Sequence, residues 1–127
     1  MLKGEEKKKI LIVEDDIYMS KALSFRLAQE GFLIKTLFNG ENVVPRVKEE
    51  DFDLVLLDLI MPKVDGWQVF RDMRDHHITT PIMVISNLGQ PEDIDRAREL
   101  GAVEYFVKNS TSLKEIIKTI QLYFKKH

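Results

Sequence analysis

The sequence predicts an α/β protein in which one parallel β-sheet is covered by helices on both faces. Five short apolar runs alternate along the chain with five amphipathic segments, which is the pattern of repeated strand–helix units. Several of the apolar runs are continuous rather than alternating, as in KILIV at 9–13, and this is typical of strands buried on both faces. Right-handed crossovers then leave few possible topologies.

The strands are expected where short apolar runs end in polar or turn-forming residues. KILIV follows a charged N-terminal stretch, and FDLVLLD ends in the single carboxylate of Asp58. The predicted strands are 9–13, 32–38, 52–58, 81–86 and 104–108.

The helices are recognised by apolar residues that recur three or four positions apart. Met19, Leu23 and Leu27 mark the first helix, and Gly31 follows it as a natural stop. Pro45 is compatible with the second helix only near its first turn. The last helix has the clearest apolar stripe. The predicted helices are 17–30, 40–50, 66–76, 91–101 and 111–126.

Composition narrows the class of protein. A chain of 127 residues suits one domain, which we place at 9–127 after a flexible tail at 1–8. The net charge of −2 gives no support for nucleic-acid binding, and the lack of cysteine excludes disulfides, thiolate metal sites and cysteine nucleophiles. No apolar run approaches the ~20 residues of a membrane helix, and no signal peptide is present, so a cytoplasmic location without membrane contact is expected.

Polar residues follow four of the five predicted strands. The first strand ends in Glu14, Asp15 and Asp16, and the third in Asp58. The fourth ends in a serine at position 86 and the fifth in a lysine at position 108. Each residue alone has an ordinary structural explanation in turns or helix caps. Together they place several carboxylates at one edge of a parallel sheet, where a hard divalent cation such as Mg²⁺ relieves their repulsion.

An ionised aspartate beside bound magnesium is a plausible nucleophile toward phosphorus. Asp58 then receives a phosphoryl group, while the metal, the Lys108 ammonium and the Ser86 hydroxyl hold the phosphoryl oxygens. The buried strand before Asp58 acts as a rigid support for this one carboxylate. Asp65 and Gly66 form a turn that leads from the site into the next helix.

The sequence resembles the response-regulator receiver domains of two-component signalling. The resemblance runs from about Lys9 to the C-terminus and rests on four motifs in the same order and spacing: ILIVEDD, DLVLLDLIMPKVDG, PIMVIS and GAVEYFVK. It implies a flavodoxin-like (βα)5 three-layer sandwich with strand order 2-1-3-4-5. The roles that it implies are metal ligation by Glu14, Asp15, Asp58 and the Ile60 backbone carbonyl, phosphoryl acceptance by Asp58, phosphoryl binding by Lys108, and switching by Ser86 and Tyr105.

The resemblance also implies a signalling phosphoacceptor rather than an enzyme in the usual sense. The phosphoryl donor is a histidine kinase or a phosphotransfer protein. Phosphorylation draws in Ser86 and turns Tyr105 inward. The fraction of molecules in the conformation that binds a downstream protein through helix 4, strand 5 and helix 5 then increases. The domain is expected to be a monomer or a phosphorylation-dependent dimer.

Two departures from the family pattern affect rates and coupling. Asn109 replaces the usual proline after Lys108, and we predict a trans peptide there because a cis bond before a non-proline costs ~2.5–4 kcal/mol. Asn87 stands where the family often has a small residue after the switch Ser or Thr. The resemblance also implies that Ile60 and Leu88, both apolar, flank the path of the attacking water, with Asn87 adding bulk at its entrance, so the aspartyl phosphate is expected to be long-lived.

Three other functions match parts of this pattern. A flavin-binding protein of this topology needs an anion cradle after strand 1, where this chain has three acids. A haloacid-dehalogenase-type phosphatase needs a second aspartate at the position of Ile60. A degenerate receiver that serves only as a docking module normally lacks a carboxylate or the lysine, whereas all of these are present.

Overall fold

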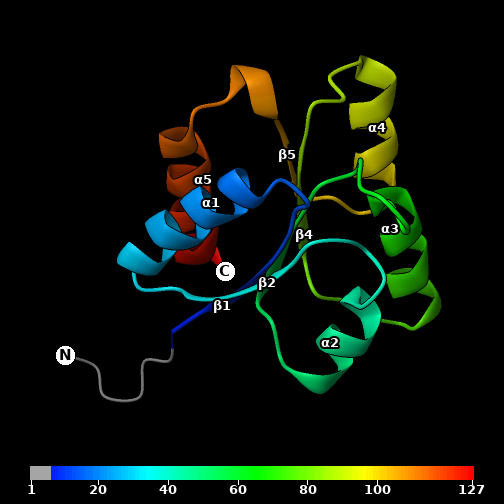
Figure 1. The fold of residues 1–127 in the computed structure, drawn as a ribbon, viewed down its shortest axis with the longest axis horizontal. Coiled ribbons are helices and arrows are strands. Elements are labelled where there is room, and N and C mark those ends of the chain that lie inside the picture. Colours follow the sequence, from blue (N-terminus) through cyan, green and yellow to red (C-terminus); the bar gives the residue numbers. More distant parts are fainter. Residues whose placement is uncertain (1–6) are drawn as a thin grey trace.

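The computed structural model describes residues 7–127, which form a three-layer α/β sandwich (Figure 1). Its middle layer is a five-stranded sheet with the order β2-β1-β3-β4-β5, and the paired strands are parallel. The fold class and strand order expected from the sequence are therefore confirmed. The strands are β1 (Lys9–Val13), β2 (Leu33–Leu37), β3 (Leu54–Leu57), β4 (Ile82–Ser86) and β5 (Glu104–Val107).

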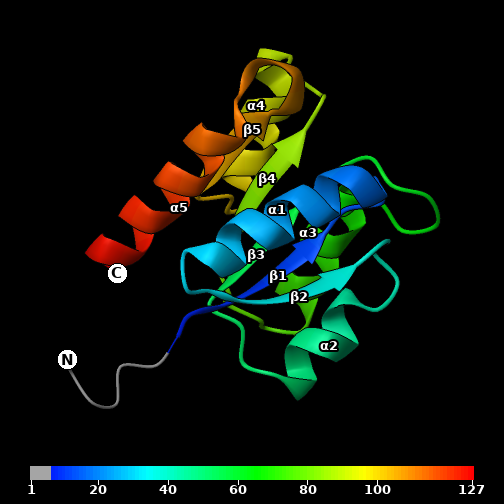
Figure 2. The same cartoon turned by 60° about the vertical axis from the view of Figure 1, so that its left-hand side comes forward.

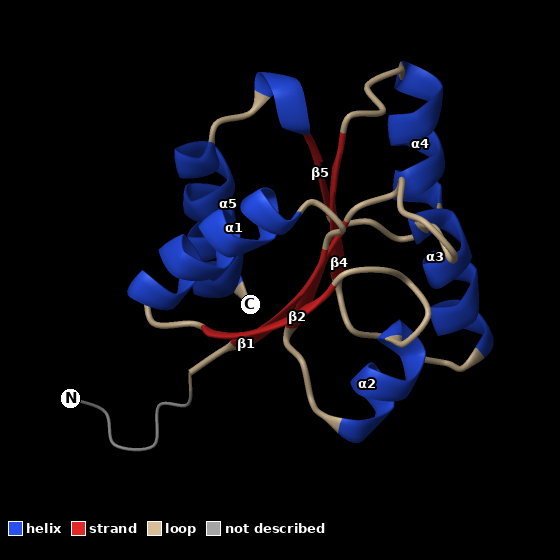
Figure 3. Cartoon of the chain, in the orientation of Figure 1, coloured by secondary structure: helices blue, strands red, loops and turns tan. Residues whose placement is uncertain are grey.

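Two groups of helices cover the two faces of the sheet (Figure 1 and Figure 3). α1 and α5 lie next to each other on one face, as Figure 2 also shows, and α2, α3 and α4 cover the other. A short 3-10 helix, η1, connects β5 to α5. The helices are α1 (Ile17–Gln29), α2 (Val43–Glu49), α3 (Gly66–Asp75), α4 (Pro91–Glu99), η1 (Lys108–Ser110) and α5 (Leu113–Lys126).

The continuous apolar runs arise because both faces of the sheet are covered. In β1, Ile10 and Ile12 belong to the core cluster beneath α1 and α5. Leu11 and Val13 belong to the cluster beneath α2, α3 and α4. All four side chains are fully buried. Alternate residues of one strand thus serve two separate cores, which is why no polar alternation is visible in the sequence.

The chain after β5 differs from expectation at two points. Lys108 was predicted as the last residue of the strand, but β5 ends one residue earlier and Lys108 opens η1. The Lys108–Asn109 peptide is trans, as predicted. The last helix was predicted from 111 but begins at 113, because Ser112 is its N-cap: the Ser112 side chain accepts from the Glu115 N–H and the Glu115 carboxylate accepts from the Ser112 N–H.

The second helix also begins later than predicted. The expected range was 40–50, but α2 starts at Val43. The chain before it forms a turn in which the Asn39 side chain accepts a hydrogen bond from the Glu41 N–H at 2.8 Å. Pro45 falls in the first turn of α2, where its missing N–H costs no helical hydrogen bond.

The N-terminal tail expected at 1–8 lies mostly outside the described residues, which begin at Lys7. The carbonyl of Lys8 accepts a hydrogen bond from the Leu33 N–H at 2.9 Å, directly before β1 begins. Among residues 7–127, no helix combines the length and apolar character that a membrane crossing needs.

Candidate functional site

The sheet places the predicted acids beside one another. β1 and β3 are neighbours, with Val13 opposite Leu57. The backbone N–H of Asp58 donates to the Val13 carbonyl at 2.9 Å, so the two strand ends are held together one residue beyond the ladder. Glu14 and Asp15 directly follow Val13. The acidic end of β1 therefore lies against the acidic end of β3.

Three carboxylates form a cluster at this edge. Glu14, Asp15 and Asp58 each offer an oxygen atom, and these oxygens all lie within 4.8 Å of one another. Glu14 is completely buried and Asp58 is only 3% exposed, whereas Asp15 is exposed to solvent. The cluster thus has a buried floor and one carboxylate at its open side.

Asp16 does not join this cluster, although it follows the same strand. Its side chain caps α1 by accepting hydrogen bonds from the N–H groups of Tyr18 at 3.0 Å and Met19 at 3.2 Å. Its own N–H donates to Glu14 Oε2 at 3.0 Å. The residue therefore orients Glu14 through its backbone and begins the helix through its side chain.

Lys108 brings a positive charge into the cluster from η1. Its Nζ lies 2.7 Å from Glu14 Oε1 and 3.1 Å from Asp58 Oδ2, and its side chain is 15% exposed. Burial by itself lowers the pKa of Lys108, but contacts with the two carboxylates outweigh it and raise the pKa. The ammonium group therefore stays charged between two acids. The sequence pattern predicted its approach to Asp58 but not its closer contact with Glu14.

Glu14 carries the strongest sign of a cation site. Burial raises its pKa to about 7, against the opposing effects of the Lys108 ammonium and the Asp16 N–H. Glu14 Oε1 is buried, and its close partner is the Lys108 ammonium at 2.7 Å, so one lysine faces a cluster of three carboxylates. The Glu14 carboxylate, together with those of Asp15 and Asp58, fits the oxygen donor set that Mg²⁺ prefers.

Ser86 and Tyr105 are joined through one residue of the loop after β4. Ser86 is fully buried at the end of β4, and its hydroxyl oxygen accepts from the Leu88 N–H at 3.2 Å. The Tyr105 hydroxyl donates to the Leu88 carbonyl, and the ring packs against the core beneath α2, α3 and α4. Burial raises the pKa of Tyr105. The part of Leu88 in linking these two residues was not predicted from the sequence.

Ile60 lies in the loop directly after Asp58. Its N–H donates to Asp58 Oδ1 at 3.2 Å, while Asp58 Oδ2 faces Lys108. The two carboxylate oxygens of Asp58 thus have different partners, one from its own loop and one from η1. The Ile60 side chain is 54% exposed. The role of the Ile60 carbonyl as a metal ligand stays a prediction.

Comparison with known proteins places this arrangement in a family. Residues 10–121 match the model of the response regulator receiver domain. The match covers most of the chain, and this chain belongs to that family. It is therefore a receiver domain, the signalling domain of two-component response regulators. Because the three carboxylates and the lysine are all present, the degenerate docking module is not favoured.

Individual relatives agree with this assignment. The probable transcriptional regulatory protein SilR of Salmonella typhimurium is 38% identical over 100 residues, which are 79% of this chain and 44% of SilR. This chain thus spans about half the length of the curated relatives it matches. The non-phosphorylated HemR receiver domain of Leptospira biflexa is 27% identical with a TM-score of 0.84, covering 91% of this chain and 93% of that one.

A third relative was solved with bound ions. The response regulator TrrA of Thermotoga maritima, in complex with Mg(2+)-BeF, is 28% identical and has a TM-score of 0.77. The similarity covers 91% of this chain and 97% of that one.

Proposed function

We propose that Asp58 accepts a phosphoryl group from a phosphohistidine on a histidine kinase or a phosphotransfer protein. The observation that carries this proposal is the position of the Asp58 carboxylate. It is buried at the end of β3, within 4.8 Å of the Glu14 and Asp15 oxygens and 3.1 Å from the Lys108 ammonium. Such an arrangement provides one nucleophilic oxygen and positive charge for the oxygens of the incoming group.

A magnesium ion fits the carboxylate cluster and would be held by Glu14, Asp15, Asp58 and the Ile60 carbonyl. The gathering of three carboxylate oxygens within 4.8 Å of one another supports this assignment, as does the likeness to TrrA, which was solved with Mg(2+)-BeF. When bound, the ion supplies positive charge to the phosphoryl oxygens and offsets repulsion among the acids.

Asp58, Lys108 and Ser86 each have a different role in the phosphoryl transfer. An Asp58 oxygen attacks phosphorus, a new P–O bond forms, and the P–N bond to the donor histidine breaks with its electron pair left on the imidazole. The Lys108 ammonium moves from its contact with Asp58 to the oxygens of the transferred group. The Ser86 hydroxyl, whose oxygen accepts a hydrogen bond from the Leu88 N–H before phosphorylation, donates its own hydrogen to another of these oxygens.

Switching follows from the same contacts. When Ser86 turns toward the phosphoryl group, its bond with the Leu88 N–H is lost, and the loop that also holds the Tyr105 hydroxyl must adjust. The inward position of Tyr105 then gains population. The surface of α4, β5 and α5 presents this change to a downstream protein or to a second copy. Nucleic acid and membrane are not partners of this domain.

The receiver domain spans residues 9–127. The domain is a cytoplasmic phosphoacceptor that assists its own phosphorylation and dephosphorylation and turns over no other substrate.

Intact mass measured after incubation with acetyl phosphate and Mg²⁺ tests the proposal. The wild-type protein should gain the mass of one phosphoryl group, which base or hydroxylamine removes. Asp58→Asn should gain none, and excess chelator should prevent the gain in the wild type. An equal gain in Asp58→Asn would exclude Asp58, and an undiminished gain with chelator would exclude the metal.

A further inference from the structure

The turn after β2 contacts the loop after Asp58 through the backbone. The N–H of Gly40 donates to the carbonyl of Val64 at 3.1 Å. β1 lies between β2 and β3 in the sheet, so this bond joins two loops whose strands are not neighbours. It is therefore a separate link, additional to the strand pairing that places Asp58.

This contact requires glycine because of the space available. A Cβ atom at Gly40 would lie 2.3 Å from the Val64 carbonyl oxygen, 2.9 Å from Val69 Cγ2 and 3.0 Å from Val64 Cγ1. The first of these atoms belongs to the backbone and cannot rotate away. Any larger residue must therefore push the loop after Asp58 outward or break the hydrogen bond.

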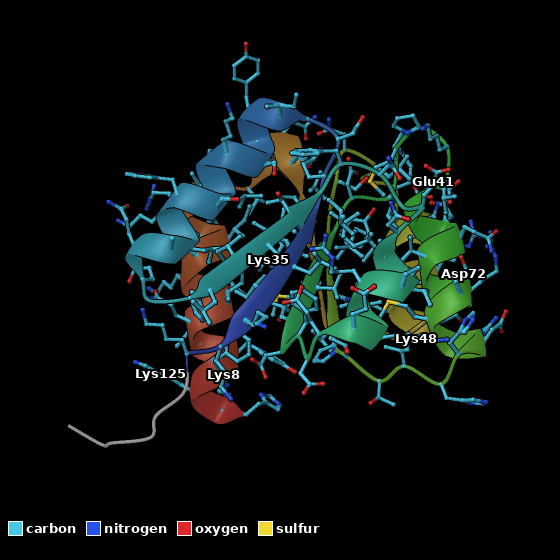
Figure 4. The ribbon with its side chains drawn as sticks, turned by 60° about the horizontal axis from the view of Figure 1, so that its bottom comes forward. Lys8, Lys35, Glu41, Lys48, Asp72 and Lys125 are labelled. Carbon is cyan, nitrogen blue, oxygen red and sulfur yellow. The ribbon has the colours of Figure 1, made fainter. Side chains whose placement is uncertain are left out.

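The same loop is closed at its base by a second bond. The Gly66 N–H donates to the Leu59 carbonyl at 2.9 Å, so both ends of the loop are held together. Near Gly40, Lys63 adopts a left-handed conformation with φ of 68°, and its Nζ lies 3.5 Å from Glu41 Oε1 (Figure 4, where Glu41 is labelled). This exposed ion pair contributes little stability. The Gly40 hydrogen bond is thus a backbone link to the outer part of the loop, in addition to the packing of Met61 and Val64 against the core.

We propose that Gly40 is a positioning residue for the reaction at Asp58. By fixing Val64, it fixes the loop on which the Ile60 carbonyl and the Ile60 N–H bonded to Asp58 are carried. This proposal rests on the proposed function. Coupling between two sites is reciprocal. If the contact helps the loop to hold Mg²⁺, then Mg²⁺ must in turn stabilise the contact.

Mg²⁺ titration by calorimetry, with Gly40→Ala and Gly31→Ala compared with the wild type, tests the proposal. Gly31 has φ of 96° with nothing within 4 Å of an added Cβ, and it ends α1 at the opposite edge of the sheet. Its alanine variant strains the backbone without touching the loop. Gly40→Ala should raise the Mg²⁺ Kd about fivefold or more and slow phosphorylation at subsaturating Mg²⁺. Gly31→Ala should change neither.

A Gly40→Ala Kd within twofold of the wild type would overturn the proposal, and so would an equal increase in Gly31→Ala. If Gly40→Ala does not fold, amide exchange of the wild type decides: Mg²⁺ should slow exchange at the Gly40 N–H, and an unchanged rate would overturn the proposal. Failure of the proposed function looks different, because the wild type itself would then bind no Mg²⁺ and gain no phosphoryl mass.

Discussion

Glu14→Gln should stabilise the metal-free protein at alkaline pH. The Glu14 side chain is completely buried, and burial raises its pKa from an ordinary 4.5 to about 7. A carboxyl group whose pKa rises on folding favours the folded state only while it is protonated. The stability that the wild type has below pH 4.5 is therefore lost progressively as the pH rises through 7.

The size of this loss follows from the two pKa values of Glu14. A rise from 4.5 to about 7 corresponds to about 3 kcal/mol of unfolding free energy at pH 8, of which less than about 1 kcal/mol is already lost at pH 5. Glutamine has nearly the same shape and keeps an acceptor for the Asp16 N–H. Because its amide group must also find a place near Lys108, we expect a gain of ~1–3 kcal/mol at pH 8.

Urea unfolding between pH 5 and pH 8, in the presence of chelator, measures this effect. With a slope of about 2 kcal/mol per M, the midpoint of Glu14→Gln should exceed that of the wild type by ~0.5–1.5 M at pH 8 and by much less at pH 5. Glu49→Gln, an exposed carboxylate on α2, is the matched control and should show no such trend. A midpoint difference for Glu14→Gln that does not grow with pH would refute the reasoning.

Three further predictions concern the loops around the site. Changing Ile60→Asn together with Leu88→Glu should speed loss of the phosphoryl group, since both side chains would then orient water. An unchanged half-life, measured by intact mass, would refute the idea that the apolar Ile60 and Leu88 side chains protect the aspartyl phosphate from water. Tyr105→Phe should lower the unfolding free energy by about 1 kcal/mol, because the Leu88 carbonyl loses its donor; an unchanged urea midpoint would contradict this. Arg96→Ala should shift the emission of Trp67, the only tryptophan, because the guanidinium lies 4.1 Å from its ring; an identical spectrum would contradict the stacking.

The sequence predicted the architecture because its pattern is repeated and consistent. Continuous apolar strands, helical stripes and polar strand ends all indicate the same sheet, and the structure has these elements in the expected order. Asp58 and Lys108 were expected to meet, and they do. These inferences succeeded because parallel strands with right-handed crossovers bring their carboxyl ends to one edge.

Several contacts could not be predicted because they depend on side-chain direction and close backbone approach. Asp16 follows the same strand as Glu14, yet it caps α1 instead of joining the acids. The contact of Lys108 with Glu14 depends on the turn of η1, which shifts the lysine beyond β5. The approach of Gly40 to the loop after Asp58 has no sequence pattern, because a glycine in a turn has many possible reasons.

Chemical trapping tests most directly whether Asp58 carries the phosphoryl group. Borohydride reduces an aspartyl phosphate to homoserine, and peptide mapping then locates the converted residue. After treatment with acetyl phosphate and Mg²⁺, we predict homoserine at position 58 and none after treatment without the metal. Homoserine at position 15, or a phosphoryl group that survives hydroxylamine on a serine or threonine, would contradict the account.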